Sequence, residues 1–237
     1  MNHRQKQLSV RLLALAALIA MVPMQAAWAG KPRPPTLTLG AALPFALLGQ
    51  TVTCTNGAII GNVGKLVAYT NTTCPVSGGQ PPATDTAAAL ADGAFLVTYD
   101  ALILRSCINQ PGSLGTMNLP PGVYCLDGTA HTGTLTLTGP KTGVWIFLSP
   151  GGAALTGTDF TVTMAGGGQA CNVWWAPDGG TTFTTSVMQG NILAGDAIDG
   201  AITLTGGALL GRALANIAVT TTNTAVIVPP TAADCPK

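Results

Sequence analysis

The chain has 237 residues, of which 47% are hydrophobic and only 8% are charged, and its formal net charge is +1 at pH 7. All nine acidic residues are Asp, so Glu is absent, and Lys is scarce as well. Both residue types usually cover the exposed faces of helices. This scarcity argues against a mainly helical protein. Abundant Thr and Gly favour strands and turns instead, and the lack of a basic patch argues against nucleic acid and anionic membranes as partners. We expect one all-β domain with many tight turns.

The first 29 residues are typical of a secretory signal peptide. A basic start precedes an apolar run over residues 12–22, and Ala27-Trp28-Ala29 has the small-x-small pattern of a cleavage site. The apolar run is shorter than the ~20 residues that a membrane span requires. We therefore predict cleavage before Gly30, a linker over residues 30–38, and a soluble mature protein. It would be secreted or extracellular, or else kept in the periplasm or at the cell surface.

All six cysteines follow the predicted cleavage site. An even number of cysteines in an exported chain predicts disulfides, although the sequence does not choose among the possible pairings. Pairing of neighbours is our expectation: Cys54–Cys74, Cys107–Cys125 and Cys171–Cys235. A zinc site is the rival interpretation, but no two cysteines have close ligand spacing and His is almost absent.

The chain changes character in four steps. Short apolar runs alternate with Thr, Asn and Gly over residues 39–67, which predicts strands and turns. Residues 68–82 contain Asn, Gly and Pro and are expected to form an irregular loop. An Ala-rich segment predicts one long helix over residues 85–105, with Thr84 as N-cap and Asp85 near the positive end of its dipole. Its stripe of Leu90, Ala94, Val97, Ala101 and Leu104 is expected to pack on the β body.

From residue 112 to residue 229 the sequence predicts strand after strand, each of five to seven residues. Thr alternates with apolar residues in several of them, for example in Thr134-Leu135-Thr136 and in Thr203-Leu204-Thr205. Such alternation places one set of side chains inside and the other outside. A β-sandwich and a β-solenoid of stacked coils both satisfy this pattern, and no exact repeat separates them.

Several motifs occur in an order that identifies a family. These are "LPPGVY" at 119–124, "GTLTLTG" at 133–139, "VWIF" at 144–147, "CNVWW" at 171–175, "GNILA" at 190–194 and "GGALLGRALA" at 206–215. Over residues 39–229 the chain resembles the microbial ice-binding protein family of bacteria and fungi. The resemblance implies an irregular, discontinuous right-handed β-solenoid of triangular section with one α-helix along a side. Residues 230–237 would form a short C-terminal tail.

The resemblance also implies a function, namely adsorption of a monomer to ice through one flat face of outward threonines, with no cofactor, metal or catalysis. Family members often present Thr, then Ala or Gly, any residue, and Thr or Asn on that face, and Thr129-Ala130-His131-Thr132 matches this pattern in full. The sequence does not tell which face would bind. The candidates are Thr53, Thr55, Thr129, Thr132, Thr134, Thr136, Thr156, Thr158, Thr161, Thr163, Thr203, Thr205, Thr220 and Thr222.

Other function classes have weaker support. For an enzyme, the best cluster is Asp196 and Asp199 with Arg212, but two Asp in a turn and a structural Arg explain it more simply. A cell-envelope or adhesion module of the same fold is the main alternative. Such a module could bind glycans if Trp174 or Trp175 faced outward, yet both lie in a hydrophobic strand and are expected to be buried.

Overall fold

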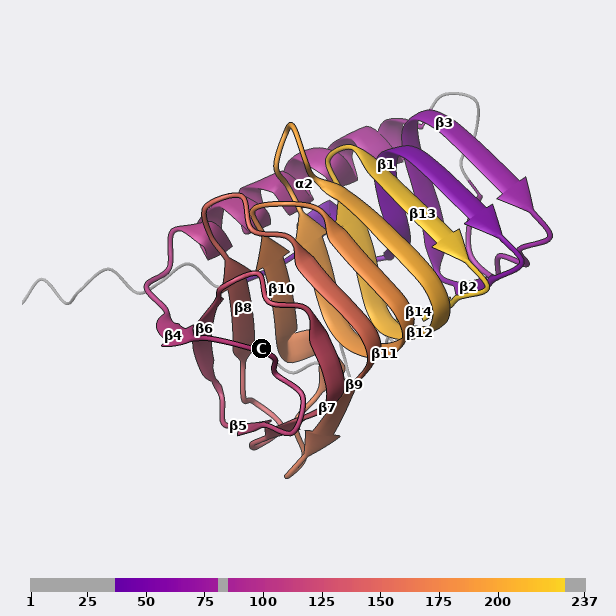
Figure 1. The fold of residues 1–237 in the computed structure, drawn as a ribbon. Coiled ribbons are helices and arrows are strands. Elements are labelled where there is room, and N and C mark those ends of the chain that lie inside the picture. The colour runs from indigo at the N-terminus through magenta and orange to yellow at the C-terminus, as the bar shows by residue number, and fades with distance from the viewer. Residues whose placement is uncertain (1–36, 81–84, 229–237) are drawn as a thin grey trace, which may run out of the picture. The chain divides into compact units, whose positions relative to one another are not determined.

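The computed structural model describes residues 37–80 and 85–228. The predicted signal peptide, most of the linker, Thr84 and the tail with Cys235 lie outside the described residues. The described part contains one α-helix and one 14-stranded sheet, and every strand pairing in that sheet is parallel (Figure 1).

The strands are β1 (Phe45–Thr55), β2 (Ala58–Ile60), β3 (Asn62–Thr72), β4 (Ile108–Gln110), β5 (Asn118–Leu119), β6 (Gly122–Leu126), β7 (His131–Thr138), β8 (Trp145–Ser149), β9 (Leu155–Ala165), β10 (Val173–Pro177), β11 (Thr181–Ala194), β12 (Ala201–Ala215), β13 (Ala218–Thr222) and β14 (Ala225–Ile227). Helix α2 covers Thr86–Ile103, and short 3₁₀ turns cover Gly40–Ala42 and Ala170–Asn172.

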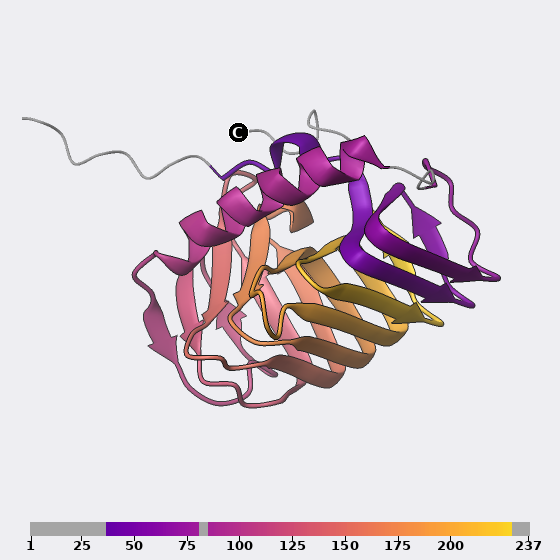
Figure 2. The same cartoon turned by 90° about the horizontal axis from the view of Figure 1, so that it is seen from above.

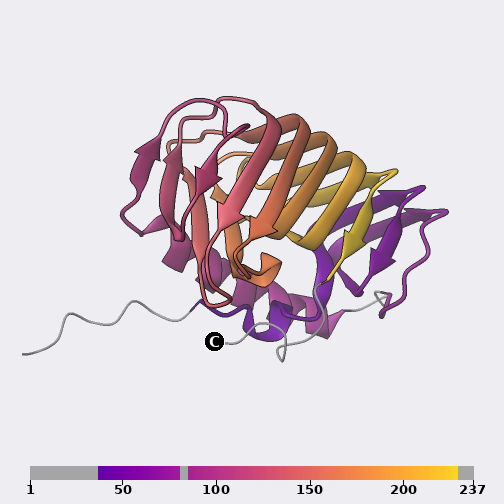
Figure 3. The same ribbon diagram turned by 90° about the horizontal axis from the view of Figure 1, so that it is seen from below.

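The chain winds in successive coils, and each coil stacks on the next through parallel pairing (Figures 1 and 3). Strand β11 shows the repeat, because its first, middle and last parts each pair with the corresponding part of β12. Several predicted short strands are therefore parts of longer strands that bend at glycines. Gly190 and Gly211 have φ of 116° and 159° at one bend, and a Cβ on Gly211 would overlap the backbone of Gly190.

The coils form three faces, which we name from their strand segments. The helix face consists of residues 45–49, 62–65, 191–194 and 212–215 with β4, β6, β8 and β10. The threonine face consists of residues 51–55, 68–72, 155–158, 181–184 and 201–205 with β13. The third face consists of residues 133–138, 161–165, 187–189 and 208–210 with β2, β5 and β14. Residues 68–72, which we expected in a loop, are thus part of the edge strand β3.

The interior of the coils is filled by apolar side chains in register. Tyr124, Phe147 and Trp175 stack on neighbouring strands, with ring centroids 5.5 Å and 4.2 Å apart. A second core lies outside the sheet, between the helix face and α2, and contains Trp174. Both tryptophans are buried as expected: Trp175 points into the coils, while Trp174 points out and is covered by the helix.

Helix α2 runs across the strands of the helix face (Figure 2). Its N-cap is Asp85, whose Oδ1 accepts a hydrogen bond from Ala88 N at 2.9 Å. The predicted packing stripe is wrong. Leu90, Val97 and Leu104 are 70%, 71% and 84% exposed, and the helix instead buries Ala88, Ala91, Phe95, Thr98, Tyr99 and Leu102. On this side, Ala88 and Ala91 are buried at one end, and the rings of Phe95 and Tyr99 pack into the second core farther along.

Disulfides hold both ends of the sheet. The Cys54–Cys74 and Cys107–Cys125 bonds are present as expected. Cys171 is also disulfide-bonded, and its predicted partner lies outside the described residues. Because β3 and β4 are the terminal strands in the sheet order, the Cys54–Cys74 bond lies at one end of the sheet and the Cys107–Cys125 bond at the other.

Candidate functional site

The threonine face presents two columns of threonines that run across its strands. Each strand segment contributes one Thr-x-Thr sequence, and the pairing register aligns these sequences from β9 through β11, β12, β13 and β1 to β3. The first column is Thr156, Thr182, Thr203, Thr220, Thr53 and Thr70, and the second is Thr158, Thr184, Thr205, Thr222, Thr55 and Thr72.

Strand alternation turns these side chains outward. Residues next to the threonines along each strand, such as Val52, Cys54 and Val219, are buried inside the coils, so the threonines face the other way. Parallel strands are ~4.8 Å apart and alternate residues along a strand are ~6.7 Å apart, which sets the spacing of the columns. Thr is branched at Cβ and therefore stiff at χ1. The result is a regular grid of hydroxyl and methyl groups on a rigid support.

A third column keeps the face flat. Ala201, Ala218, Thr51 and Ala68 are paired in register beside the first threonine column. Their side chains are small, so none rises above the neighbouring threonines. The strand segments of the threonine face contain no charged residue, which makes the surface flat, neutral and periodic.

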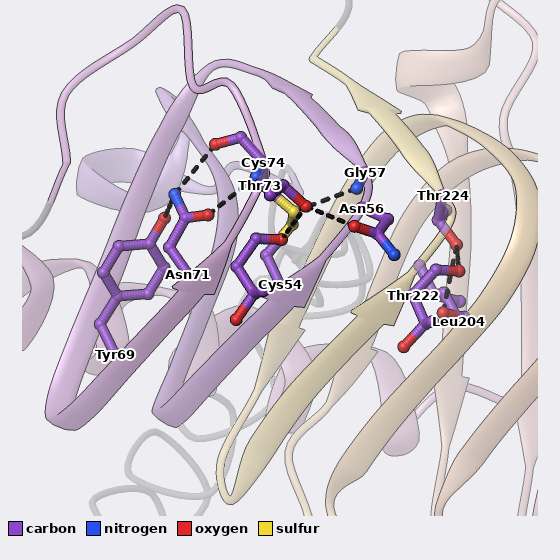
Figure 4. The surroundings of a disulfide bond; sticks show 11 residues. Cys54, Asn56, Gly57, Tyr69, Asn71, Thr73, Cys74, Leu204, Thr222 and Thr224 are labelled. Atoms are coloured by element: carbon purple, nitrogen blue, oxygen red, sulfur yellow. Dashed lines mark hydrogen bonds between the residues drawn. A yellow bond between two sulfur atoms is a disulfide. The ribbon is translucent and has the colours of Figure 1, made fainter.

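The second threonine of each pair is followed by a residue with positive φ, and the chain turns there toward the third face. Asn56, Asp159 and Asn223 have φ of 51°, 50° and 52° at this corner, a conformation that Asn and Asp tolerate best among non-glycine residues. Thr73 and Thr185 hold the same conformation, with φ of 60° and 48°. Their hydroxyls donate to Asn56 Oδ1 and Asp159 Oδ1, respectively, so neighbouring corners are linked. Figure 4 shows the bond between Thr73 and Asn56.

Buried hydroxyls stabilise the same corner from inside. Thr224 Oγ1 donates to Leu204 O at 3.1 Å (Figure 4). Ser186 Oγ donates to Thr184 O at 2.9 Å and accepts from Phe160 N at 3.2 Å. These bonds satisfy backbone groups that the bend removes from the strand ladder. The corner therefore fixes both the direction of the chain and the register of the Thr-x-Thr sequences.

The fourteen threonines predicted from the sequence fall into three groups. Thr53, Thr55, Thr156, Thr158, Thr203, Thr205, Thr220 and Thr222 lie together in the two columns. Thr134, Thr136, Thr161 and Thr163 lie on the third face, where Thr134 pairs with Thr161 and Thr136 with Thr163. Thr129 precedes β7, and Thr132 lies at its start. His131, inside the single full match to the family motif, pairs with Gly157 between Thr156 and Thr158, so this motif lies beside the columns at their β9 end.

Four members of the columns were not predicted from the sequence, namely Thr70, Thr72, Thr182 and Thr184. The Thr-x-Thr spacing could have identified them, because it occurs in every strand segment of this face. Thr70 and Thr72 lie in the segment that was assigned to a loop. In residues 181–185 the extra threonines hide the alternation, because Thr181 is buried and faces inward.

Asp196 and Arg212, which were considered for catalysis, make hydrogen bonds within the fold. Asp196 Oδ1 accepts hydrogen bonds from the backbone N–H groups of Ile198 and Asp199, both at 2.7 Å, and so forms a turn. Arg212 is 4% exposed. It donates to Leu43 O at 2.8 Å and to Asn191 Oδ1 at 2.9 Å, and burial lowers its pKa to about 10. Within residues 37–80 and 85–228, no group of three His, Cys, Asp or Glu side chains could hold a metal ion.

Comparison with known proteins relates this architecture to one family. The model of the ice-binding-like family matches residues 46–227. An ice-binding protein of Flavobacterium frigoris (strain PS1) is 31% identical over 215 residues, which cover 81% of this chain and 76% of that protein. The crystal structure of an ice-binding protein from the Antarctic ascomycete Antarctomyces psychrotrophicus matches with a TM-score of 0.73 and 26% identity, over 83% of this chain and 100% of that one. An ice-binding protein from an Antarctic bacterium of the Flavobacteriaceae gives a TM-score of 0.73 at 32% identity, over 84% of this chain and 48% of that one.

Proposed function

The chain belongs to the ice-binding-like family, and from that premise we propose that it adsorbs to ice through the threonine face. The observation that carries the proposal is the register of the Thr-x-Thr sequences across β9, β11, β12, β13, β1 and β3. A crystal surface is periodic in two directions, and the threonine columns are periodic in two directions as well. Thr53, Thr55, Thr156, Thr158, Thr203, Thr205, Thr220 and Thr222, together with Thr70, Thr72, Thr182 and Thr184, are the proposed contact residues.

The physical basis is pre-organisation. Threonine hydroxyls hydrogen-bond water and their methyl groups order the water between them, so the grid can hold a layer of water that matches an ice plane. Little side-chain entropy is lost on adsorption because each Thr is stiff at χ1 and its strand is held on both sides. A neutral face also avoids the cost of removing water from charged groups.

Several features complete the proposal. The coils would form an irregular, right-handed β-solenoid of triangular section, and the protein would act as a secreted monomer after loss of residues 1–29. Its disulfides favour a location in an oxidising compartment outside the cytosol, since such bonds are rare in the cytosol. Adsorption needs neither a cofactor nor catalysis.

The test measures thermal hysteresis and inhibition of ice recrystallisation on the oxidised chain from residue 30 to residue 237. The decisive variant is Thr220→Tyr, because Thr220 lies on β13 near the middle of the columns and a bulky ring there would hold the face away from ice. We expect a decrease in activity of about tenfold or more, equivalent to a loss of about 1.4 kcal/mol of adsorption free energy. The matched control is Val97→Tyr, which adds the same ring to an exposed position on α2.

Circular dichroism and the melting temperature establish that both variants are folded. An inactive, folded wild-type protein would overturn the proposed function and would favour a binding or cell-envelope role for this fold. A Thr220→Tyr variant as active as Val97→Tyr would overturn the assignment to the threonine face.

A further inference from the structure

The third face contains two more columns of outward side chains in parallel register. One column is Thr134, Thr161, Val187, Ala208, Ala225 and Ala58. In the other, Thr136 pairs with Thr163 at one end, and Gln189, Leu210, Ile227 and Ile60 follow in register on the remaining strands. Because much of this face is built from the same coils as the threonine face, its columns have the same spacing of ~4.8 Å between strands.

The chemistry of these columns changes along the face. Threonines are present only on β7 and β9, and from β11 to β2 the side chains are aliphatic except for Gln189, whose Nε2 donates to Val162 O at 3.0 Å. Val187, Leu210 and Ile60 are 43%, 37% and 49% exposed. The strand segments of this face contain no charged residue. A contiguous, uncharged apolar surface of this kind indicates contact with something other than bulk water.

The form of the surface favours contact with an ordered water lattice and argues against a protein partner. Protein interfaces depend on large anchors, mainly Trp, Tyr and Arg, that fill pockets of the partner. None of these residue types is present in the two columns, and three of the members, Ala58, Ala208 and Ala225, are too small to anchor anything. What the columns offer is a repeating row of methyl groups, and apolar groups restrict the orientation of the water that covers them.

We propose that the third face is a second ice-adsorbing surface, which acts mainly through the aliphatic part of its two columns, from β11 to β2. This inference rests on the proposed function of the threonine face. The two faces meet at the corner of Asn56, Asp159, Thr185 and Asn223, whose backbone conformation and hydrogen bonds fix the angle between them. The protein therefore presents two different periodic surfaces at one fixed angle, and each surface matches its own ice plane.

The experiment maps adsorption of fluorescently labelled protein on a hemisphere cut from a single ice crystal. It compares the wild type, Thr220→Tyr, Ala225→Tyr, the double variant and the control Val97→Tyr. Ala225 lies near the middle of the aliphatic part of the third face, so its substitution blocks that face alone. Leu210→Lys provides a second variant, because it places a charge on the same face through a side chain that already reaches solvent.

We expect Thr220→Tyr to keep adsorption on a set of planes that Ala225→Tyr loses. In the double variant, total adsorption falls a further tenfold or so below that of Thr220→Tyr. The inference is overturned if Thr220→Tyr alone abolishes all adsorption, or if neither Ala225→Tyr nor Leu210→Lys changes the pattern of planes. Both results leave the threonine face as the site. Failure of the wild type to adsorb at all overturns the proposed function and this inference with it.

Discussion

Three consecutive threonines in β13 have different surroundings. Thr220 and Thr222 belong to the outer columns, whereas Thr221 points inward, is fully buried and pairs in register with Leu204 and Cys54. The hydroxyl of Thr221 has no hydrogen-bond partner within the part of the chain that the structure describes. A buried hydroxyl without a partner costs about 1–3 kcal/mol.

Replacement of Thr221 by Val should therefore stabilise the fold. Val has nearly the same shape and removes the unpaired hydroxyl, so we expect the free energy of unfolding to rise by about 1 kcal/mol. Chemical denaturation measures this change. Thr222→Val is the matched control, since it makes the same substitution on the outer side of the same strand and should change stability by less than about 0.5 kcal/mol. A less stable Thr221→Val variant would contradict the inward assignment.

His131 should make stability depend on pH. It is 2% exposed, its Nδ1 accepts a hydrogen bond from Leu114 N at 3.2 Å, and its ring centroid lies 5.4 Å from that of Phe160. Burial lowers its pKa, and the nearby charge of Asp127 partly opposes this effect. The folded state therefore favours neutral His131, whereas the unfolded chain takes up a proton near the ordinary pKa of about 6.5.

The contribution of neutral His131 to the free energy of unfolding is thus fully present above about pH 6.5. It is lost as the pH falls below that value toward the lower pKa of the folded state. We expect the free energy of unfolding to decrease on acidification from about pH 7 to about pH 5. His131→Gln, which keeps an acceptor for Leu114 N, should flatten the curve in this range. The exposed carboxyl of Asp127, with a pKa lowered to about 2 by hydrogen bonds from Thr129 and Gly112, titrates at lower pH and does not account for this change.

At the level of elements, Gly195 allows helix α2 to approach the sheet. Tyr99 lies against Gly195, and its hydroxyl donates to Pro177 O at 3.1 Å. A Cβ on Gly195 would overlap the Tyr99 ring. Gly195→Ala should therefore destabilise the fold by about 1–3 kcal/mol, as expected when extra volume is forced into a packed core.

Gly93 provides the matched control for this substitution. It lies within α2, and a Cβ there would have no atom within 4 Å. Gly93→Ala should stabilise the helix by about 0.5–1 kcal/mol, because Ala loses less backbone entropy than Gly. Thermal melts of the two variants should shift in opposite directions. A shared direction would contradict the packing described for Tyr99.

At this level, local sequence determines the presence of the elements, whereas contacts between elements determine which of their residues are buried. The helix was predictable because an Ala-rich run follows two prolines and Asp85, which is its N-cap. Its buried side was not, because apolar residues surround the helix and only the neighbouring sheet decides which of them fit. Inward and outward positions in Thr203-Leu204-Thr205 follow from alternation alone. The columns do not, since Thr53 and Thr220 become neighbours only through the register of coils that lack an exact sequence repeat.

At the level of the whole molecule, the two disulfides have different relations to the threonine face. Cys54 lies between Thr53 and Thr55 on β1, and its bond to Cys74 ties this strand to the segment that follows Thr72. The bond between Cys107 and Cys125 joins the segment before β4 to β6. Both of these strands belong to the helix face, so only the first disulfide supports the columns.

Removal of each disulfide should separate stability from function. The bonded residues are 20 and 18 positions apart, so loss of either bond should lower the free energy of unfolding by a similar amount, about 3 kcal/mol. Cys54→Ser with Cys74→Ser should also loosen Thr53, Thr55, Thr70 and Thr72 and shorten the rigid grid. Cys107→Ser with Cys125→Ser should leave the grid complete. Thermal hysteresis, measured well below both melting temperatures, is expected to fall only in the first variant. An equal decrease in both would mean that ice adsorption depends on global stability, and no decrease in either would mean that the columns on β1 and β3 are not needed.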